Sequence, residues 1–192
     1  ISGGIFQGTV ENRNSYTGEE SIPGVICGGT FQGEVHNWGT ISSGTFQEKV
    51  HNSGTISDGT FHEEVYNNDG TISDGTFQGE VYNHGTISGG TFQGGEVYNV
   101  RGAISGGTFE KRMTLMNDDA SITISDGLFK GEVSTGICRF PLSISGGLFT
   151  KAVDVSHVYN PTDLSITGGY FVSEPTVPNG SDISFTSVSD QS

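Results

Sequence analysis

Basic residues are scarce in this chain of 192 residues, where 8 Lys and Arg stand against 22 Asp and Glu for a formal net charge of −14 at pH 7. We expect no nucleic-acid partner, because no cationic surface is available to meet phosphates. We expect no membrane insertion either, since no run approaches the roughly 18 apolar residues that a span requires. Because the sequence opens on Ile1-Ser2-Gly3-Gly4, with no pattern typical of a signal peptide, we expect a mature or excised piece.

Hydrophobic residues are also few, at 32% of the chain, whereas glycine is abundant, with 31 residues. Average glycine usage is about 7%, so an ordinary layered globular core is not expected. Composition alone would permit either a disordered chain or a repeat fold. Internal self-similarity is the observation that decides between the two.

A phenylalanine returns along the chain at intervals of 15 to 25 residues. An Ile stands five residues before each of these Phe residues, and in most units a Val stands four residues after it. This regularity excludes a disordered chain. The anchor residues are Phe6, Phe31, Phe46, Phe61, Phe77, Phe92, Phe109, Phe129, Phe149 and Phe171.

Each unit contains three short extended pieces with one inward apolar residue each, separated by bends at Gly or Asn. Stacking the units about 4.8 Å apart places Ile on Ile, Phe on Phe and Val on Val. We therefore predict an all-β, single-stranded parallel β-solenoid (β-helix) of about ten coils of 15–22 residues. A right-handed coil is favoured by the general preference of parallel crossovers. The Asn that follows the Val by two residues is expected to stack its amide from coil to coil. These residues are Asn37, Asn52, Asn67, Asn83 and Asn99.

The spacing of the anchors divides the chain into segments. The solenoid is predicted over residues 1–171, with a loop insertion at 13–25, regular coils over 26–103 and expanded coils over 104–171. Residues 172–192 are predicted to form a C-terminal cap or a linker. Insertions in solenoids form loops on one face and often carry specificity.

The sequence has only two cysteines, Cys27 and Cys138. They lie six coils apart, or roughly 29 Å at about 4.8 Å per coil. A disulfide requires Cα atoms within about 7 Å, so no intramolecular bridge is expected. Cysteine usage therefore does not indicate the redox compartment of the protein.

One outward column of the predicted solenoid consists of histidine and tyrosine. We favour the interpretation that these rings stack on one another along the sheet, because aromatic pairs on adjacent strands stabilise the pairing of those strands. The alternative is a platform for a ligand such as a sugar ring. The column consists of His36, His51, Tyr66, Tyr82 and Tyr98.

A second outward column is mostly acidic, and residues 26–100 hold nine acids and one base, a net charge of 1 − 9 = −8. Calcium could neutralise such a column, but the repeats lack the Gly-Gly-x-Gly-x-Asp pattern of calcium-binding solenoids. Solubility is the default explanation of the charge, and we predict no cofactor and no metal site. The column consists of Glu34, Lys49, Glu64, Glu80 and Glu96.

Catalytic motifs are absent from the sequence, since no nucleophile elbow, P-loop or metalloprotease signature occurs. No pair of carboxylates stands apart from the other acids. We therefore predict no catalytic residue and a non-enzymatic protein. The alternative is a carbohydrate-active β-helix enzyme acting on polysaccharide, which a cleft lined by Asp, Glu and Arg139 beside the expanded coils would support.

Hydroxyl side chains flank the inward Ile in four successive units. A regular Thr-x-Thr array on 15-residue coils is typical of insect antifreeze solenoids, which these coils resemble. The second residue is Ser here and lacks the methyl group, so ice binding is a minor alternative. The array consists of Thr40, Ser42, Thr55, Ser57, Thr71, Ser73, Thr86 and Ser88.

The unit Ile-Ser-Gly-Gly-Thr-Phe, and especially the stretch from Leu164 to Pro175, resembles repeats in large surface proteins of gut Firmicutes and related bacteria. The resemblance implies a pectin-lyase-like β-helix without lyase residues, located outside the cell or attached to its surface. It implies a stalk, spacer or adhesin segment. Partners would be host or bacterial glycans or a surface protein, and the coil ends could associate end to end.

Overall fold

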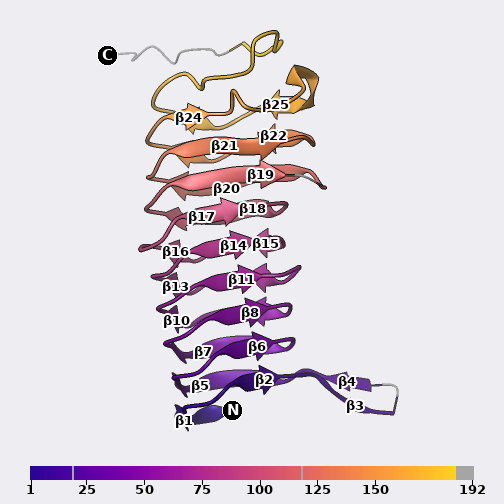
Figure 1. The fold of residues 1–192 in the computed structure, drawn as a ribbon, viewed down its shortest axis with the longest axis vertical. Helices are drawn as coiled ribbons and strands as arrows, with labels where there is room; N and C mark the ends of the chain where they lie inside the picture. Colours follow the sequence, from indigo (N-terminus) through magenta and orange to yellow (C-terminus); the bar gives the residue numbers. More distant parts are fainter. Residues whose placement is uncertain (19, 118, 185–192) are drawn as a thin grey trace.

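The chain folds into a stack of parallel β-strands that rises along one axis, as Figure 1 shows. The structure is a computed structural model that describes residues 1–18, 20–117 and 119–184. In these residues the only helical element is the 3-10 turn η1 (Pro161–Asp163). The predicted all-β parallel solenoid is confirmed. Eight complete turns run from Ile26 to Ile166, with an incomplete coil at each end.

Two parallel sheets form the walls of the stack, and each strand pairs with its equivalent in the next coil. The nine-stranded sheet consists of β2 (Val10–Asn12), β6 (Val35–Asn37), β8 (Val50–Asn52), β11 (Val65–Asn67), β14 (Val81–Asn83), β17 (Val97–Asn99), β19 (Met113–Asn117), β21 (Val133–Cys138) and β24 (Val153–Asp154).

The fifteen-stranded sheet is bent between its Ile side and its Phe side. It consists of β1 (Ser2–Phe6), β5 (Val25–Phe31), β7 (Thr40–Phe46), β9 (Thr55–Ile56), β10 (Thr60–Phe61), β12 (Thr71–Ile72), β13 (Thr76–Phe77), β15 (Thr86–Ile87), β16 (Thr91–Phe92), β18 (Ala103–Phe109), β20 (Ile122–Phe129), β22 (Leu142–Ile144), β23 (Leu148–Phe149), β25 (Leu164–Ile166) and β26 (Tyr170–Phe171).

The core is built from three inward columns of Ile, Phe and Val. The ten anchor phenylalanines form one continuous stack, with neighbouring ring centroids 4.5 to 5.0 Å apart and ring planes within 11° of parallel. The spacing follows from the distance between hydrogen-bonded strands, about 4.8 Å. A thin rod therefore buries enough apolar surface with a low hydrophobic content.

A glycine marks the bend between the Ile and Phe sides of each coil. Gly44 and Gly59 have φ angles of 134° and 135°, which L side chains rarely adopt. A Cβ atom added at either position would lie 3.2 Å from the ring of the Phe two residues later. The bend thus requires glycine for both backbone conformation and space.

The predicted asparagine stack is also confirmed, and it begins one coil earlier than expected, at Asn12. Each buried amide donates from Nδ2 to Oδ1 of the next Asn at 2.7 Å, through six residues that end at Asn99. The ladder ends there because Leu115 occupies the next position in the register. Buried polar groups are thus satisfied by one another.

Residues 13–25 carry the antiparallel hairpin of β3 (Ser15–Thr17) and β4 (Glu20–Ile22), which projects from the base of the stack in Figure 1. At the other end, Val177 and Ile183 pack against the core. Residues 185–192 of the predicted cap or linker lie outside the described residues. No helix that is long and apolar enough to span a membrane occurs in the described part of the chain.

Candidate functional site

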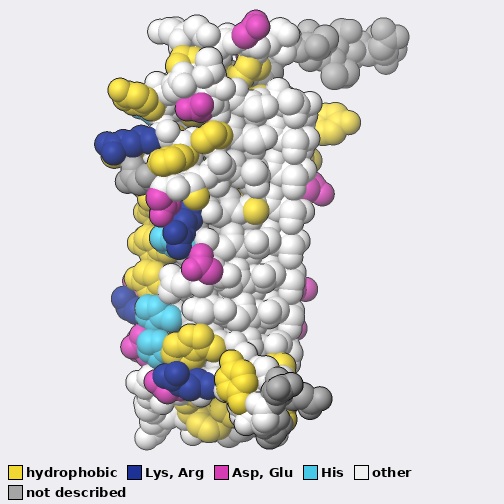
Figure 2. Space-filling model, turned by 90° about the vertical axis from the view of Figure 1, so that its right-hand side faces the viewer, with side chains coloured by type: hydrophobic (Ala, Val, Ile, Leu, Met, Phe, Trp, Pro, Cys, Tyr) yellow, Lys and Arg dark blue, Asp and Glu magenta, His cyan; other side chains and the backbone are white. Residues whose placement is uncertain are grey.

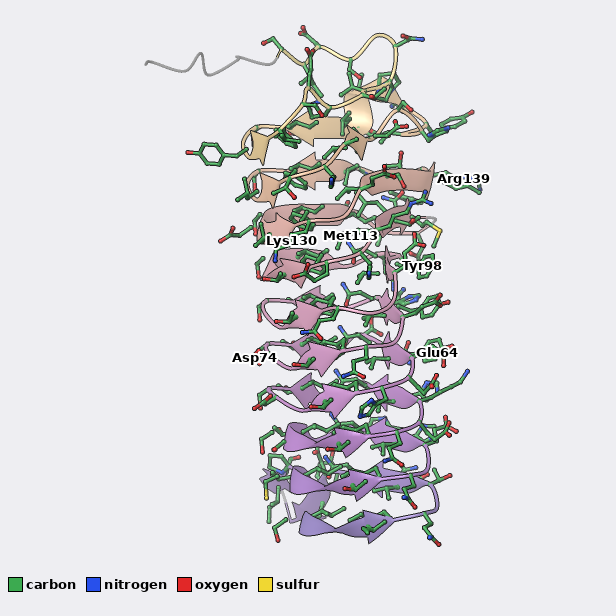
Figure 3. All side chains as sticks on the ribbon, turned by 90° about the vertical axis from the view of Figure 1, so that its left-hand side faces the viewer. Glu64, Asp74, Tyr98, Met113, Lys130 and Arg139 are labelled. Carbon is green, nitrogen blue, oxygen red and sulfur yellow. The ribbon has the colours of Figure 1, made fainter. Side chains whose placement is uncertain are left out.

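The outer face of the nine-stranded sheet carries the aromatic and acidic columns that the sequence predicts. Residues on either side of each inward Val point outward, because side chains alternate along a strand. Figure 3 places Glu64 and Tyr98 along one edge of the solenoid, with Asp74 and Lys130 along the opposite edge. In Figure 2 the histidines and many charged and hydrophobic side chains gather along one edge. The face beside this edge shows mostly backbone and side chains that are neither charged nor hydrophobic.

The five predicted rings form one continuous stack. Neighbouring centroids from His36 to Tyr98 are 4.9 to 5.0 Å apart, with ring planes within 10° of parallel. Trp38 extends the stack beyond His36 at 5.9 Å, and the Arg13 guanidinium lies 4.3 Å from the Trp38 ring centroid. A sugar stacks on the face of a ring, and these faces contact their neighbours. The geometry therefore favours the stacking interpretation, because the four rings from His36 to Tyr82 each have a neighbouring ring on both faces.

Glu34 connects the two histidines of the stack. Its Oε1 atom lies 3.3 Å from Nε2 of His36 and 2.8 Å from Nε2 of His51. All three side chains are partly exposed. The carboxylate therefore holds two successive rings in one orientation.

The central carboxylates are stabilised by neighbours, which limits the repulsion expected between them. Lys49 Nζ lies 3.2 Å from Glu64 Oε2, and the Tyr82 hydroxyl donates to Glu80 at 2.7 Å. That hydrogen bond, together with burial, raises the pKa of Tyr82 well above its ordinary value, because the carboxylate favours the protonated phenol.

Glu96, the last acid of the column, has three neighbours. It accepts hydrogen bonds from the hydroxyls of Tyr98 and Thr114, and its Oε1 atom lies 3.6 Å from Nε of Arg112. Burial and the two carboxylates of Glu96 and Glu80 raise the pKa of Tyr98. Within residues 1–18, 20–117 and 119–184, no three His, Cys, Asp or Glu side chains form a group that could hold a metal ion.

The hydroxyl array lies on the Ile side of the coils, in register from coil to coil. Its four serines bond to the backbone of the solenoid. Each Ser hydroxyl donates to the carbonyl of the Ile in the preceding coil at 3.2 to 3.4 Å. Half of the hydroxyls in the predicted ice-binding array are therefore oriented by the backbone of the solenoid. The threonines Thr40, Thr55, Thr71 and Thr86 are partly exposed beside them.

The two cysteines do not bond to each other, as predicted. Cys27 is exposed and donates to the carbonyl of Ile1, whereas Cys138 is buried and donates to the carbonyl of Leu115.

A pocket of about 470 Å³ opens beside the expanded coils, where the end of β21 meets the loop that follows β24. A cleft lined by acids beside Arg139 would have supported the enzyme alternative, and none of the seven described lining residues of this pocket carries a carboxylate. These residues are Thr135, Gly136, Ile137, Cys138, Arg139, His157 and Tyr159.

Three residues with the chemistry of a catalytic triad lie next to this pocket. Ser156 Oγ donates to Asp154 Oδ1 at 2.6 Å and lies 3.4 Å from Nδ1 of His157. In a triad the histidine stands between the serine and the acid, but here the serine stands between them. The Ser156 hydroxyl and N–H both bind Asp154 and lower its pKa. The arrangement is that of a turn closed by an aspartate.

No family model, curated protein or solved structure matches this chain. Its candidate sites therefore rest on its own geometry.

Sequence reasoning missed two features of these surfaces. It assigned no role to Arg13 and Trp38, which extend the aromatic stack at the foot of the hairpin. It named Arg139 in the enzyme alternative and noted that insertions often carry specificity, but it did not bring Ile137 and Tyr159 together beside Arg139. The available signal in the sequence was an apolar or aromatic residue, Ile137 or Tyr159, in each of two successive insertions. In the structure these side chains are 58% and 84% exposed.

Proposed function

We propose that this chain is a stiff, non-enzymatic segment of an extracellular or surface-attached bacterial protein, and that it acts as a stalk or spacer. The observation that carries this proposal is the continuous stack of ten phenylalanines, with every centroid spacing between 4.5 and 5.0 Å. Bending the rod would change the distances between the stacked rings, separating them in one direction of bending and compressing them in the opposite direction. Stability in such a repeat array arises from contacts between neighbouring coils.

The location outside the cell is supported by the resemblance of the repeats to those of bacterial surface proteins. The acidic surface supports it as well, because a net charge of −14 keeps long rods apart in solution. An adhesin segment is the variant of this proposal in which the rod also binds a glycan or a surface protein. The enzyme and ice-binding alternatives stay predictions, since no contact described above favours either.

The rod is tested by removing one coil. Deletion of residues 47–61 joins Phe46 to His62 and keeps the spacing from Phe to Val. Small-angle X-ray scattering should show a rod shorter by about 4.8 Å, and unfolding should stay cooperative. Deletion of residues 47–53 is the matched control, because it breaks the register and should abolish cooperative unfolding. A scattering profile of a flexible chain for the intact protein would refute the proposal.

The adhesin variant is tested separately, by binding of the intact rod to arrayed glycans and to mucin. A specific and saturable signal supports adhesion. Silence against all of these ligands rejects adhesion to glycans and leaves the spacer.

A further inference from the structure

The basic residues of the chain are concentrated in the expanded coils. Six of the eight lie between residues 101 and 151, which also hold five acids, a net charge of 6 − 5 = +1. Residues 26–100 have a net charge of −8. The wall of the pocket at the end of β21 belongs to this least acidic segment, whereas His157 and Tyr159 on the opposite wall come from residues 152–192, which hold five acids and no base. Arg139 is the one basic side chain that lines the pocket.

Backbone contacts between two successive coils hold the walls of this pocket together. The Tyr159 N–H donates to the carbonyl of Cys138 at 2.8 Å, and Cys138 forms a parallel bridge with Val158. The His157 N–H donates to Oγ1 of Thr135 at 3.3 Å. The pocket is thus built by residues that belong to the hydrogen-bonded stack, and its shape does not depend on a free loop.

The pocket presents two exposed apolar surfaces beside one guanidinium. Tyr159 and Ile137 are 84% and 58% exposed, and Arg139 is exposed as well. Figure 3 shows Arg139 reaching away from the stack, on the same edge as Glu64 and Tyr98. The Tyr159 ring lies outside the long aromatic stack, in which Tyr66 and Tyr82 each have a ring against both faces. Its exposed ring can therefore present a face to a ligand, which those two rings cannot.

We propose that this pocket binds a small aromatic carboxylate, with the aromatic ring against Tyr159 and Ile137 and the carboxylate on Arg139. Guanidinium groups bind carboxylates through paired N–H donors, and aromatic rings add contact area and favourable ring geometry. The volume of about 470 Å³ lies in the usual range for small-molecule sites. The ligand is either a free aromatic acid or the C-terminal carboxylate of a peptide that ends in an aromatic residue. This inference is independent of the stalk function.

The test is an NMR titration of the full chain, with backbone amide shifts as the readout. Phenylacetate is the probe for a free acid, N-acetylphenylalanine is the probe for a peptide C-terminus, and N-acetylphenylalaninamide is the neutral control. We expect saturable shifts confined to residues 135–139 and 157–159, with a dissociation constant on the order of millimolar for ligands of this size. Tighter binding of N-acetylphenylalanine assigns the peptide source, and tighter binding of phenylacetate assigns the free acid.

Four variants separate the specific site from general charge and exposure. Arg139→Gln should weaken binding at least fivefold, whereas Lys151→Gln removes another exposed charge, outside the pocket, and should leave the affinity unchanged. Tyr159→Ala should abolish saturation, whereas Tyr170→Ala, at another exposed tyrosine, should not. The proposal is overturned if no shift saturates, if the neutral amide binds equally well, or if Arg139→Gln and Lys151→Gln have the same effect.

Discussion

The regular coils and the expanded coils share the inward Ile and Phe columns and differ in the buried asparagine ladder and in the outer surface. The phenylalanine column passes through both regions with the same spacing, 4.7 Å between Phe77 and Phe92 and 4.5 Å between Phe129 and Phe149. The aromatic stack and the acidic column belong to the regular coils, and the asparagine ladder runs through them from Asn12; all three end at or before residue 99. The inward columns therefore maintain the fold, while insertions alter the outer surface without disturbing the stack.

Removal of one ring from the core column is expected to have the largest effect. Phe77→Ala in the regular coils and Phe129→Ala in the expanded coils should each lower the free energy of unfolding by about 3–5 kcal/mol, because each leaves a cavity between two stacked neighbours. Denaturant unfolding measures both values. If the Phe129→Ala loss is less than half of the Phe77→Ala loss, the core is not equivalent in the two regions.

Replacement of a ladder amide is expected to have an intermediate effect that is specific to the regular coils. Asn67→Leu places a leucine in the ladder, as the protein itself does at Leu115, the position that follows Asn99 in the register. It removes the partner of a donor on Asn52 and the partner of an acceptor on Asn83, at a cost of about 2 kcal/mol. Asn68→Leu, at the exposed neighbour, is the control and should change stability little. Equal stability of Asn67→Leu and the parent protein would show that the ladder is dispensable.

The smallest effect concerns the tyrosines of the acidic face at high pH. Because the folded pKa of Tyr82 is raised, the folded state retains a proton that the unfolded state loses near pH 10. The stability supplied by this group is therefore complete below pH 10 and declines as the pH rises further. Absorbance titration of the phenolate should show Tyr82 ionising late, and Glu80→Gln should shift its midpoint down toward the ordinary value. An unchanged midpoint would remove Glu80 as the cause.

The sequence predicted the elements that repeat, because a period of about 15 residues places equal side chains on top of one another. The three core columns, the asparagine ladder and the aromatic column all follow from this rule. The same spacing, about 4.8 Å, also leaves no room for a ligand between Tyr66 and Tyr82. The hairpin at 13–25 and the pocket at Arg139 could not be found in this way, because they depend on contacts that occur once. The bond from Tyr159 to Cys138 is one such contact.

The asparagine ladder gives the rod a direction. All five amide-to-amide hydrogen bonds point the same way, from Nδ2 of the earlier coil to Oδ1 of the later one. Aligned amide dipoles add along their axis, as peptide dipoles do in a helix. Turning one amide over would set two donors against each other on one side and two acceptors on the other. The six side chains can therefore reverse only in concert, which makes the interior of the rod an electrically polar filament with distinguishable ends.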